Sequence, residues 1–202
     1  MKYPLLLLFA LLLGTRAPAQ TLSSSTYGET VSDHALEAKR IHHQKRAMLL
    51  LGGWAVGNIG LGLALRGSRV GEARRFHEMN AIWNTVNLGI AALGYLSVAR
   101  EDPAALDAFG SLAENHGLQK VLLFNAGLDV AYVVGGMYLR ERARRPDVDA
   151  DRLRGYGNSV LLQGGFLLVF DLVNYCIAAG RDADYAPLLG PTSEGIGLTL
   201  GF

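Results

Sequence analysis

Residues 121–139 read VLLFNAGLDVAYVVGGMYL, a run of nineteen residues with one carboxylate residue and no lysine or arginine. At about 1.5 Å per residue, a helix of this length is close to the ~30 Å hydrocarbon core of a bilayer. Runs of similar length and character occupy residues 47–65, 79–98 and 160–179. Apolar residues occur at both odd and even positions of each run, whereas transmembrane strands alternate apolar and polar residues over about ten positions. The sequence therefore predicts an all-α, integral membrane four-helix bundle over residues 47–179.

The composition excludes several other classes of protein. Of 202 residues, 50% are hydrophobic and 18% charged, and the formal net charge is +1. No lysine-rich stripe is present, which argues against a nucleic-acid partner, because such binding neutralises phosphates. A single cysteine excludes an internal disulfide framework and a thiolate-rich zinc site. No HExxH, GxSxG or glycine-rich phosphate loop occurs, so we expect no cofactor, no metal and a non-enzymatic role.

Residues 1–19 have the organisation of a secretory signal peptide. Lys2 supplies the positive charge, residues 5–13 the apolar stretch, and residues 17–19 (Ala-Pro-Ala) the small-residue cleavage site. Nine consecutive apolar residues are too few to span a bilayer core of about 30 Å. We therefore expect cleavage before Gln20; an uncleaved short anchor is the alternative.

Lysine and arginine are unequally distributed between the two sides of the predicted bundle. The loop between the first and second spans and the loop between the third and fourth together carry ten, against seven on the opposite side. Cytoplasmic loops are enriched in these residues, so both loops are predicted to face the cytoplasm. Signal cleavage requires the same topology, with both termini outside. Residues 20–46 are then an outer tail and polar helix, and residues 180–202 an outer C-terminal tail.

Two segments outside the spans carry local signals. The last eight residues, GIGLTLGF at 195–202, alternate large apolar and small residues. We expect a short extended segment there, which either adds to the edge of a partner's sheet or lies on the membrane. Between the second and third spans, Asp102 as N-cap and Pro103 as the first helical residue predict a separate amphipathic helix that ends before Gly117.

Each predicted span carries polar residues at spacings that return to one helical face. In chain order they are Trp54 and Asn58, then Asn80, Asn84 and Asn87, then Asn125, Asp129 and Tyr132, and finally Gln163, Asp171 and Asn174. Amide and carboxyl groups are costly to expose to lipid, so the four stripes are predicted to face one another. Counted from the span ends, Asn58, Asn87, Asp129 and Asp171 are predicted to lie at one depth, as a polar midplane cluster.

The two aspartates are the most costly members of this cluster. An Asp at a helix centre is unfavourable by about 2.5–3.5 kcal/mol, while each Leu, Ile, Phe or Val contributes only about 0.3–0.6 kcal/mol. No lysine, arginine or histidine lies at that depth. The aspartates therefore are protonated, share a proton, face a wet cavity or bind a cation; the alternative is that they only hold the helices together, at about 0.6 kcal/mol per contact.

We hypothesise that the cluster binds or passes a small polar solute or a proton. The candidate binding residues are Asp129, Asp171, Asn58, Asn84, Asn87, Asn125, Gln163 and Asn174. One alternative is a structural or scaffolding component of a larger envelope complex. The other is a membrane enzyme that uses the two aspartates, although no nucleophile or cofactor motif accompanies them.

Small residues recur along one face in two of the predicted spans. They are Gly53, Gly57 and Gly60 in the first span and Gly127, Ala131 and Gly135 in the third. Such faces let helix backbones approach closely. We predict that they pack within one bundle, with a homo-oligomer through the same faces as the alternative.

Five short strings in the spans carry a family resemblance. They are Trp54-x-x-x-Asn58, residues 79–87 (MNAIWNTVN), residues 125–129 (NAGLD), residues 163–166 (QGGF) and Phe170-Asp171. In these strings the chain resembles a family of small bacterial integral membrane proteins known only as a domain of unknown function. The resemblance covers roughly residues 42–175 and implies a location in the bacterial cell membrane. The two outer tails are then periplasmic, and no catalytic assignment comes with the family.

Overall fold

The computed structural model describes residues 27–185, with side chains described from His34 onward, and the regular structure of this part is helical. The helices are α1 (Tyr27–Arg66), α2 (Gly71–Ala99), α3 (Ala108–Arg142), α4 (Ala150–Gly180) and the short α5 (Asp182–Tyr185). The predicted all-α class and the four long helices are confirmed within these residues. The predicted signal peptide (1–19) and the C-terminal extended segment (195–202) lie outside the described residues.

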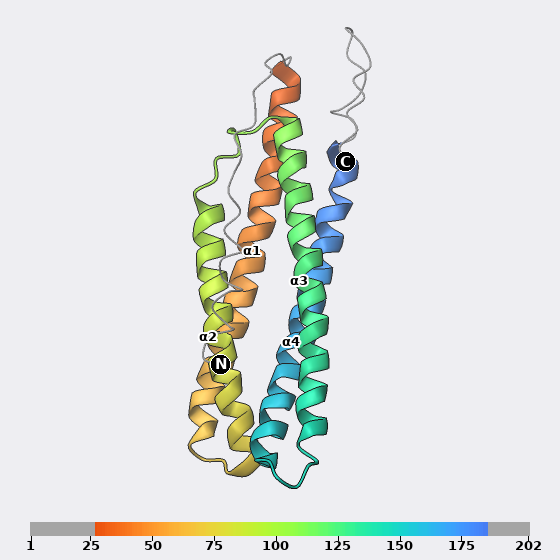
Figure 1. The fold of residues 1–202 in the computed structure, drawn as a ribbon. Helices are drawn as coiled ribbons and strands as arrows, with labels where there is room; N and C mark the ends of the chain where they lie inside the picture. The colour runs from red at the N-terminus through yellow and green to blue at the C-terminus, as the bar shows by residue number, and fades with distance from the viewer. Residues whose placement is uncertain (1–26, 186–202) are drawn as a thin grey trace.

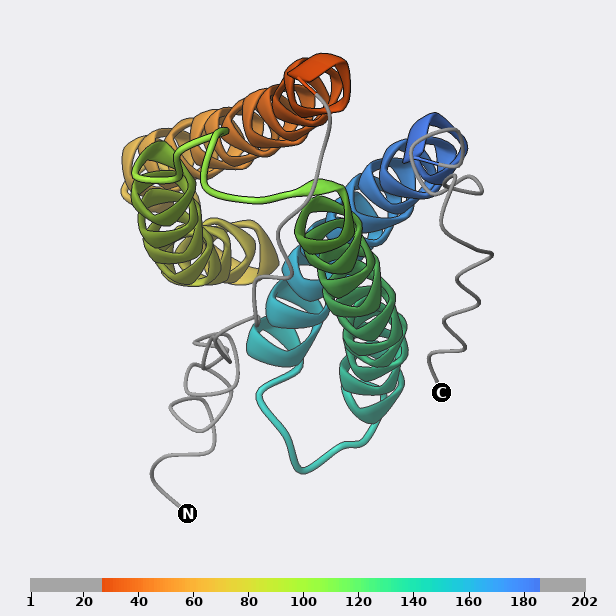
Figure 2. The same cartoon turned by 90° about the horizontal axis from the view of Figure 1, so that it is seen from above.

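The four long helices form two antiparallel hairpins, α1–α2 and α3–α4 (Figure 1). Contacts between α2 and α4 join the hairpins, and these two helices run in the same direction (Figures 1 and 2). The α1–α2 and α3–α4 loops lie together at one end of the molecule, which we call the arginine end. The α2–α3 loop, the start of α1 and the end of α4 lie at the other end, which we call the network end.

The polarity of the bundle is opposite to that of a water-soluble helical protein. Large apolar side chains face outward on all four helices, with Leu61 60% and Val169 62% exposed, whereas Asn84 and Gln163 are fully buried. A small apolar core of Leu51, Ala91 and Phe170 joins α1, α2 and α4. All four helices are long and apolar enough to cross a membrane. Such an arrangement suits a lipid environment, in which polar groups must find partners inside the protein.

The structure corrects the prediction for the α2–α3 loop. No separate helix begins at Asp102, because its carboxylate accepts a hydrogen bond from the Ala104 N–H (2.9 Å) within a turn. Asp107 is the N-cap instead, accepting from the Gly110 N–H at 2.8 Å, and α3 continues without interruption through Gly117. A single glycine costs a helix interior only about 1 kcal/mol, which does not end a helix of 35 residues.

The predicted glycine faces do not pack within the bundle. A Cβ atom at Gly53, Gly57, Gly60, Gly127 or Gly135 would meet no described atom within 4 Å. The close approaches occur at other glycines. A Cβ at Gly155 would lie 2.5 Å from the Glu72 carbonyl oxygen of α2, and one at Gly136 would lie 2.9 Å from the Gly157 carbonyl oxygen of α4. The sequence spacing located small residues, but the direction in which each helix faces its neighbour decides which of them are used.

Candidate functional site

Side chains from three helices form a closed amide cluster, which consists of Trp54, Asn58, Asn80 and Gln163. The Trp54 Nε1–H donates to Gln163 Oε1 (2.9 Å), and Gln163 Nε2 donates to Asn80 Oδ1. Asn80 Nδ2 donates to Asn58 Oδ1 (2.8 Å), and Asn58 Nδ2 donates to the Trp54 carbonyl oxygen (2.8 Å). Each of the three amides thus both donates and accepts, so the polar groups of the amide cluster are satisfied by the protein itself.

From Asn80 of the amide cluster, further amide side chains continue along α2 toward the network end. Asn84 Nδ2 donates to the Asn80 carbonyl oxygen (2.8 Å), and Asn87 Nδ2 approaches Asn84 Oδ1 at 3.4 Å. Both side chains are buried. Seven residues of helix separate Asn80 from Asn87, which is about 10 Å along the axis. The prediction that Asn58 and Asn87 lie at one depth is therefore wrong. Asn58 lies at the level of Asn80, closer to the arginine end than Asn87.

Asp129 of α3 and Asp171 of α4 form a second and separate site, the aspartate pair. The two residues are only 3% and 6% exposed, and their carboxyl groups lie within hydrogen-bonding reach of each other. Neither forms an ion pair with a basic side chain of the described residues. Asp129 Oδ2 is buried and has no hydrogen-bond donor among the described residues. Unlike the amide cluster, the aspartate pair therefore contains a buried acceptor that no described residue satisfies.

Two of the predicted site residues lie at the edges of these groups. Asn125 is half-buried, and its side-chain amide makes no hydrogen bond within the described part of the chain. Asn174 is buried but donates to the Phe170 carbonyl oxygen of its own helix (2.7 Å). The eight candidate residues thus divide into an amide group around Gln163, the aspartate pair, and these two amides.

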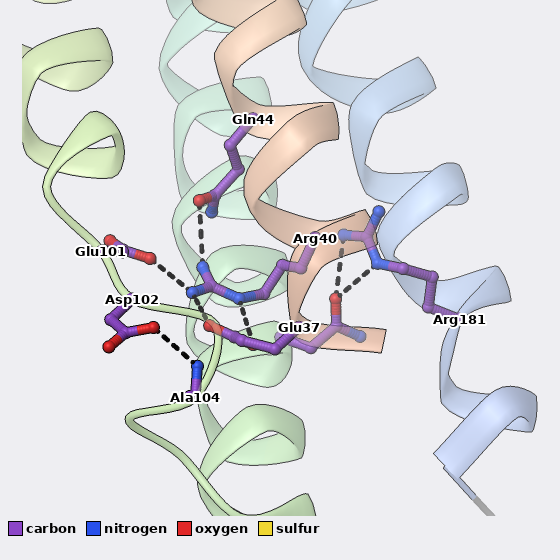
Figure 3. Close-up of polar contacts among 8 residues, drawn as sticks. Glu37, Arg40, Gln44, Glu101, Asp102, Ala104 and Arg181 are labelled. Atoms are coloured by element: carbon purple, nitrogen blue, oxygen red, sulfur yellow. Dashed lines mark hydrogen bonds and ion pairs between the residues drawn. The ribbon is translucent and has the colours of Figure 1, made fainter. Parts of the chain in front are cut away.

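A buried ionic group at the network end was missed by the sequence analysis. Figure 3 shows Arg40 of α1 between Glu37 on its own helix and Glu101 of the α2–α3 loop. Its Nε donates to Glu37 Oε2 at 2.9 Å and its Nη1 to Gln44 Oε1 at 2.9 Å. Arg40 and Glu37 are 2% and 1% exposed, so this part of the predicted polar tail is packed inside the protein.

A second arginine extends this group across the remaining helices. Arg181, at the end of α4, donates from Nε (3.1 Å) and Nη2 (2.9 Å) to Asn115 Oδ1 of α3. Its Nη1 lies 3.1 Å from His43 Nδ1 of α1, and Asn115 Nδ2 donates to Asp182 Oδ1 (2.7 Å). These residues, with those around Arg40, form the end network. The sequence signal that could have revealed it is the helical spacing of Leu36, Glu37, Arg40 and Ile41, which places them on one face of α1. The structure buries this face.

The described part of the chain offers no evident metal centre, since no group of three or more His, Cys, Asp or Glu side chains is placed to hold an ion there. What it defines is an all-helical protein with four helices apolar enough to cross a membrane and polar side chains turned inward. Its sequence matches the sequence model of DUF6992, a family of unknown function, over residues 50–172, and the chain belongs to that family.

The family match confirms the predicted resemblance to an uncharacterised family. A search of curated proteins and a search of solved structures found no match. The matched range includes the amide cluster and the aspartate pair, while Arg40 and Arg181 of the end network lie outside it.

Proposed function

We propose that this is a bacterial integral membrane protein whose aspartate pair binds a proton inside the bundle. The observation that carries the proposal is Asp129 Oδ2, a buried oxygen without a donor among the described residues, beside the carboxyl group of Asp171. A buried acceptor left unsatisfied costs about 1–3 kcal/mol. A proton held between the two carboxyl groups supplies the missing donor and removes one of two like charges.

The amide cluster supports a different role for its own residues. Its donors and acceptors are already paired, and Trp54 stacks on Phe166 with ring centroids 3.9 Å apart and an interplanar angle of 4°. A ligand at this level would have to displace those bonds. We therefore assign the amide cluster to helix packing and the proton to Asp129 and Asp171 alone.

Infrared spectroscopy of the protein reconstituted in lipid at pH 7 tests the proton site. The wild type is expected to show the carbonyl band of a protonated carboxylic acid, resolved from the carboxylate bands. The Asp129→Asn/Asp171→Asn double variant should lose that band, because Asn keeps the shape but cannot carry the proton. Asp147→Asn is the matched control, since Asp147 is exposed and lies in the α3–α4 loop.

Two outcomes would reject the proton site. One is a wild-type spectrum without a protonated carboxyl band. The other is a band that survives in the double variant. Thermal melting of each variant, which should stay close to the wild type, shows that the loss of the band is not a loss of folding.

We also propose that both arginine-rich loops face the cytoplasm and both termini the periplasm, with a mature chain that begins near Gln20. The arginine count and the signal-like residues 1–19 support this topology. In a Cys176→Ser background, a cysteine at exposed Ala105 should react with an impermeant thiol reagent in intact cells, and one at exposed Ser68 should not. Labelling of Ser68→Cys from outside, or an intact mass that includes residues 1–19, would contradict the proposal.

Self-association is a second candidate function, favoured by the open glycine faces. Gly53, Gly57 and Gly60 meet nothing within 4 Å in a single chain, and GxxxG faces are typical of helix–helix contacts in membranes. Sedimentation in detergent should then show a dimer for the wild type and a monomer for Gly57→Leu. A wild-type monomer, or a Gly57→Leu dimer, excludes this face.

A further inference from the structure

The arginine end carries a hollow that neither the amide cluster nor the aspartate pair uses. Its volume is about 450 Å³, within the range of about 300–1,000 Å³ typical of ligand pockets. Glu72 of α2, Arg140 of α3, and Arg154 and Asn158 of α4 line it, so three helices contribute to one site.

The acidic residues of this hollow are already engaged, whereas two of its arginines are not. Glu72 Oε1 accepts a hydrogen bond from Asn158 Nδ2 at 2.7 Å, and Glu141 pairs with Arg144 at 3.2 Å. The guanidinium groups of Arg140 and Arg154 have no ion pair or hydrogen bond with other described residues. Two guanidinium groups from neighbouring helices therefore remain available on one hollow, and such pairs suit the oxygens of a phosphate group.

The packing of α3 on α4 positions one of these arginines. A Cβ atom at Gly157 would lie 2.9 Å from Arg140 Cγ, so the absence of a side chain at Gly157 lets the stem of Arg140 lie against α4. Arg140 directly follows the predicted span 121–139, and Arg154 precedes the span 160–179 by six residues, about 1.7 turns of helix. Both guanidinium groups are thus placed at the edge of the apolar layer, at the depth of lipid headgroups.

An apolar track leads away from the hollow along α3. Met137 lines the hollow and is 57% exposed, and Val134 and Val130 follow on the same face at spacings of three and four, 58% and 49% exposed. A molecule that satisfies both features has an anionic head and an apolar chain. We propose that the hollow binds the phosphate of an anionic phospholipid between Arg140 and Arg154, with one acyl chain along Met137, Val134 and Val130. This inference rests on the proposed membrane location.

Native mass spectrometry of the full-length protein in detergent tests the proposal. The protein is titrated with phosphatidylglycerol and, separately, with phosphatidylcholine of the same acyl chains. The wild type should retain phosphatidylglycerol preferentially. Arg140→Gln/Arg154→Gln should weaken its retention by about tenfold or more, because each lost charge-assisted hydrogen bond corresponds to roughly that factor.

Arg142→Gln/Arg145→Gln is the matched control, since it removes the same charge from the same end but outside the hollow. It should retain phosphatidylglycerol as the wild type does. An equal loss in both double variants would show attraction by net charge without a site and overturn the proposal. Displacement of the lipid by inorganic phosphate alone would show a site for a soluble phosphate and would also overturn it.

A third variant covers the case in which the glutamine variant fails to fold. Arg140→Lys/Arg154→Lys keeps both charges but lacks the planar fork, so it should bind more weakly than the wild type and more strongly than the glutamine variant. Equal binding by the lysine variant and the wild type would contradict recognition of the phosphate by the guanidinium groups of Arg140 and Arg154. Resistance of the wild type to alkaline extraction from membranes separates the two proposals. If the protein is extracted, the membrane location fails, and if it resists while showing no lipid preference, only the lipid site fails.

Discussion

Among individual residues, Gln163 and Asn125 show how the same chemical group can have different consequences. Both are amides within predicted spans and both fell on polar stripes. Gln163 is fully buried and its side chain is hydrogen-bonded to Trp54 and Asn80, whereas the half-buried side chain of Asn125 makes no hydrogen bond in the described residues. The hydrogen-bond partner, more than the residue type, therefore decides what each amide contributes to stability.

This difference predicts the effect of removing each amide. Gln163→Leu should lower the free energy of unfolding by about 1–3 kcal/mol, because it leaves the Trp54 Nε1–H and the amide of Asn80 without their partner. Asn125→Leu should change it by less than about 0.5 kcal/mol, as expected where no specific contact is lost. Unfolding in mixed micelles measures both values. Equal losses in the two variants would contradict the amide cluster.

For whole helices, close packing depends on a few glycines at α2–α4 and α3–α4 contacts. Gly155 allows α4 to approach the backbone of α2, and Gly136 and Gly157 face each other across α3 and α4. The glycines of the GxxxG pattern are elsewhere on their helices and stay open.

We predict that Gly155→Leu destabilises the bundle by about 1–3 kcal/mol or more, because the new side chain meets backbone atoms that cannot move aside. Gly57→Leu should leave the stability of the single chain nearly unchanged, since its Cβ would meet nothing within 4 Å. Melting in detergent under dilute, monomeric conditions compares them. A stable Gly155→Leu protein would show that α2 and α4 are not packed as described.

Prediction from sequence succeeded for the helices and only partly for the site. Apolar runs fixed the number and type of the long helices, because a span length is a simple physical requirement. Helical spacing also placed Asn80, Asn84 and Asn87 on one face. It did not show that Asn58 of α1 lies opposite Asn80 of α2, so Asn58 was assigned to the depth of Asn87. Neighbour relations between helices depend on three-dimensional packing, which a single sequence does not reveal.

In the whole molecule, the end network ties α1 to the α2–α3 loop and links the two hairpins through the Arg181–His43 contact. Arg40 joins α1 to Glu101 of the α2–α3 loop, and Arg181 joins α4 to α3 and α1. Removal of one partner from a buried ionic group costs about 3–5 kcal/mol, because the remaining charge stays buried.

We therefore predict that Arg40→Met lowers the free energy of unfolding by about 3–5 kcal/mol, with increased hydrogen exchange at the start of α1 and in the α2–α3 loop. Lys39→Met is the matched control, because Lys39 is the neighbouring residue on α1 and is exposed. Exchange that stays unchanged in the Arg40 variant would show that Arg40 does not hold the start of α1 to the α2–α3 loop.

The amide cluster can form only after α4 has been synthesised, because its residues come from the first hairpin and from α4. Asn58 and Asn80 belong to the first hairpin, but their partner Gln163 lies on α4, the last long helix to leave the ribosome. Until then, the amide oxygens of Asn58 and Asn80 in the nascent first hairpin lack the hydrogen-bond donor that Gln163 supplies. A chain interrupted before α4 therefore keeps unpaired amide groups in its first hairpin, and these groups distinguish it chemically from the complete fold.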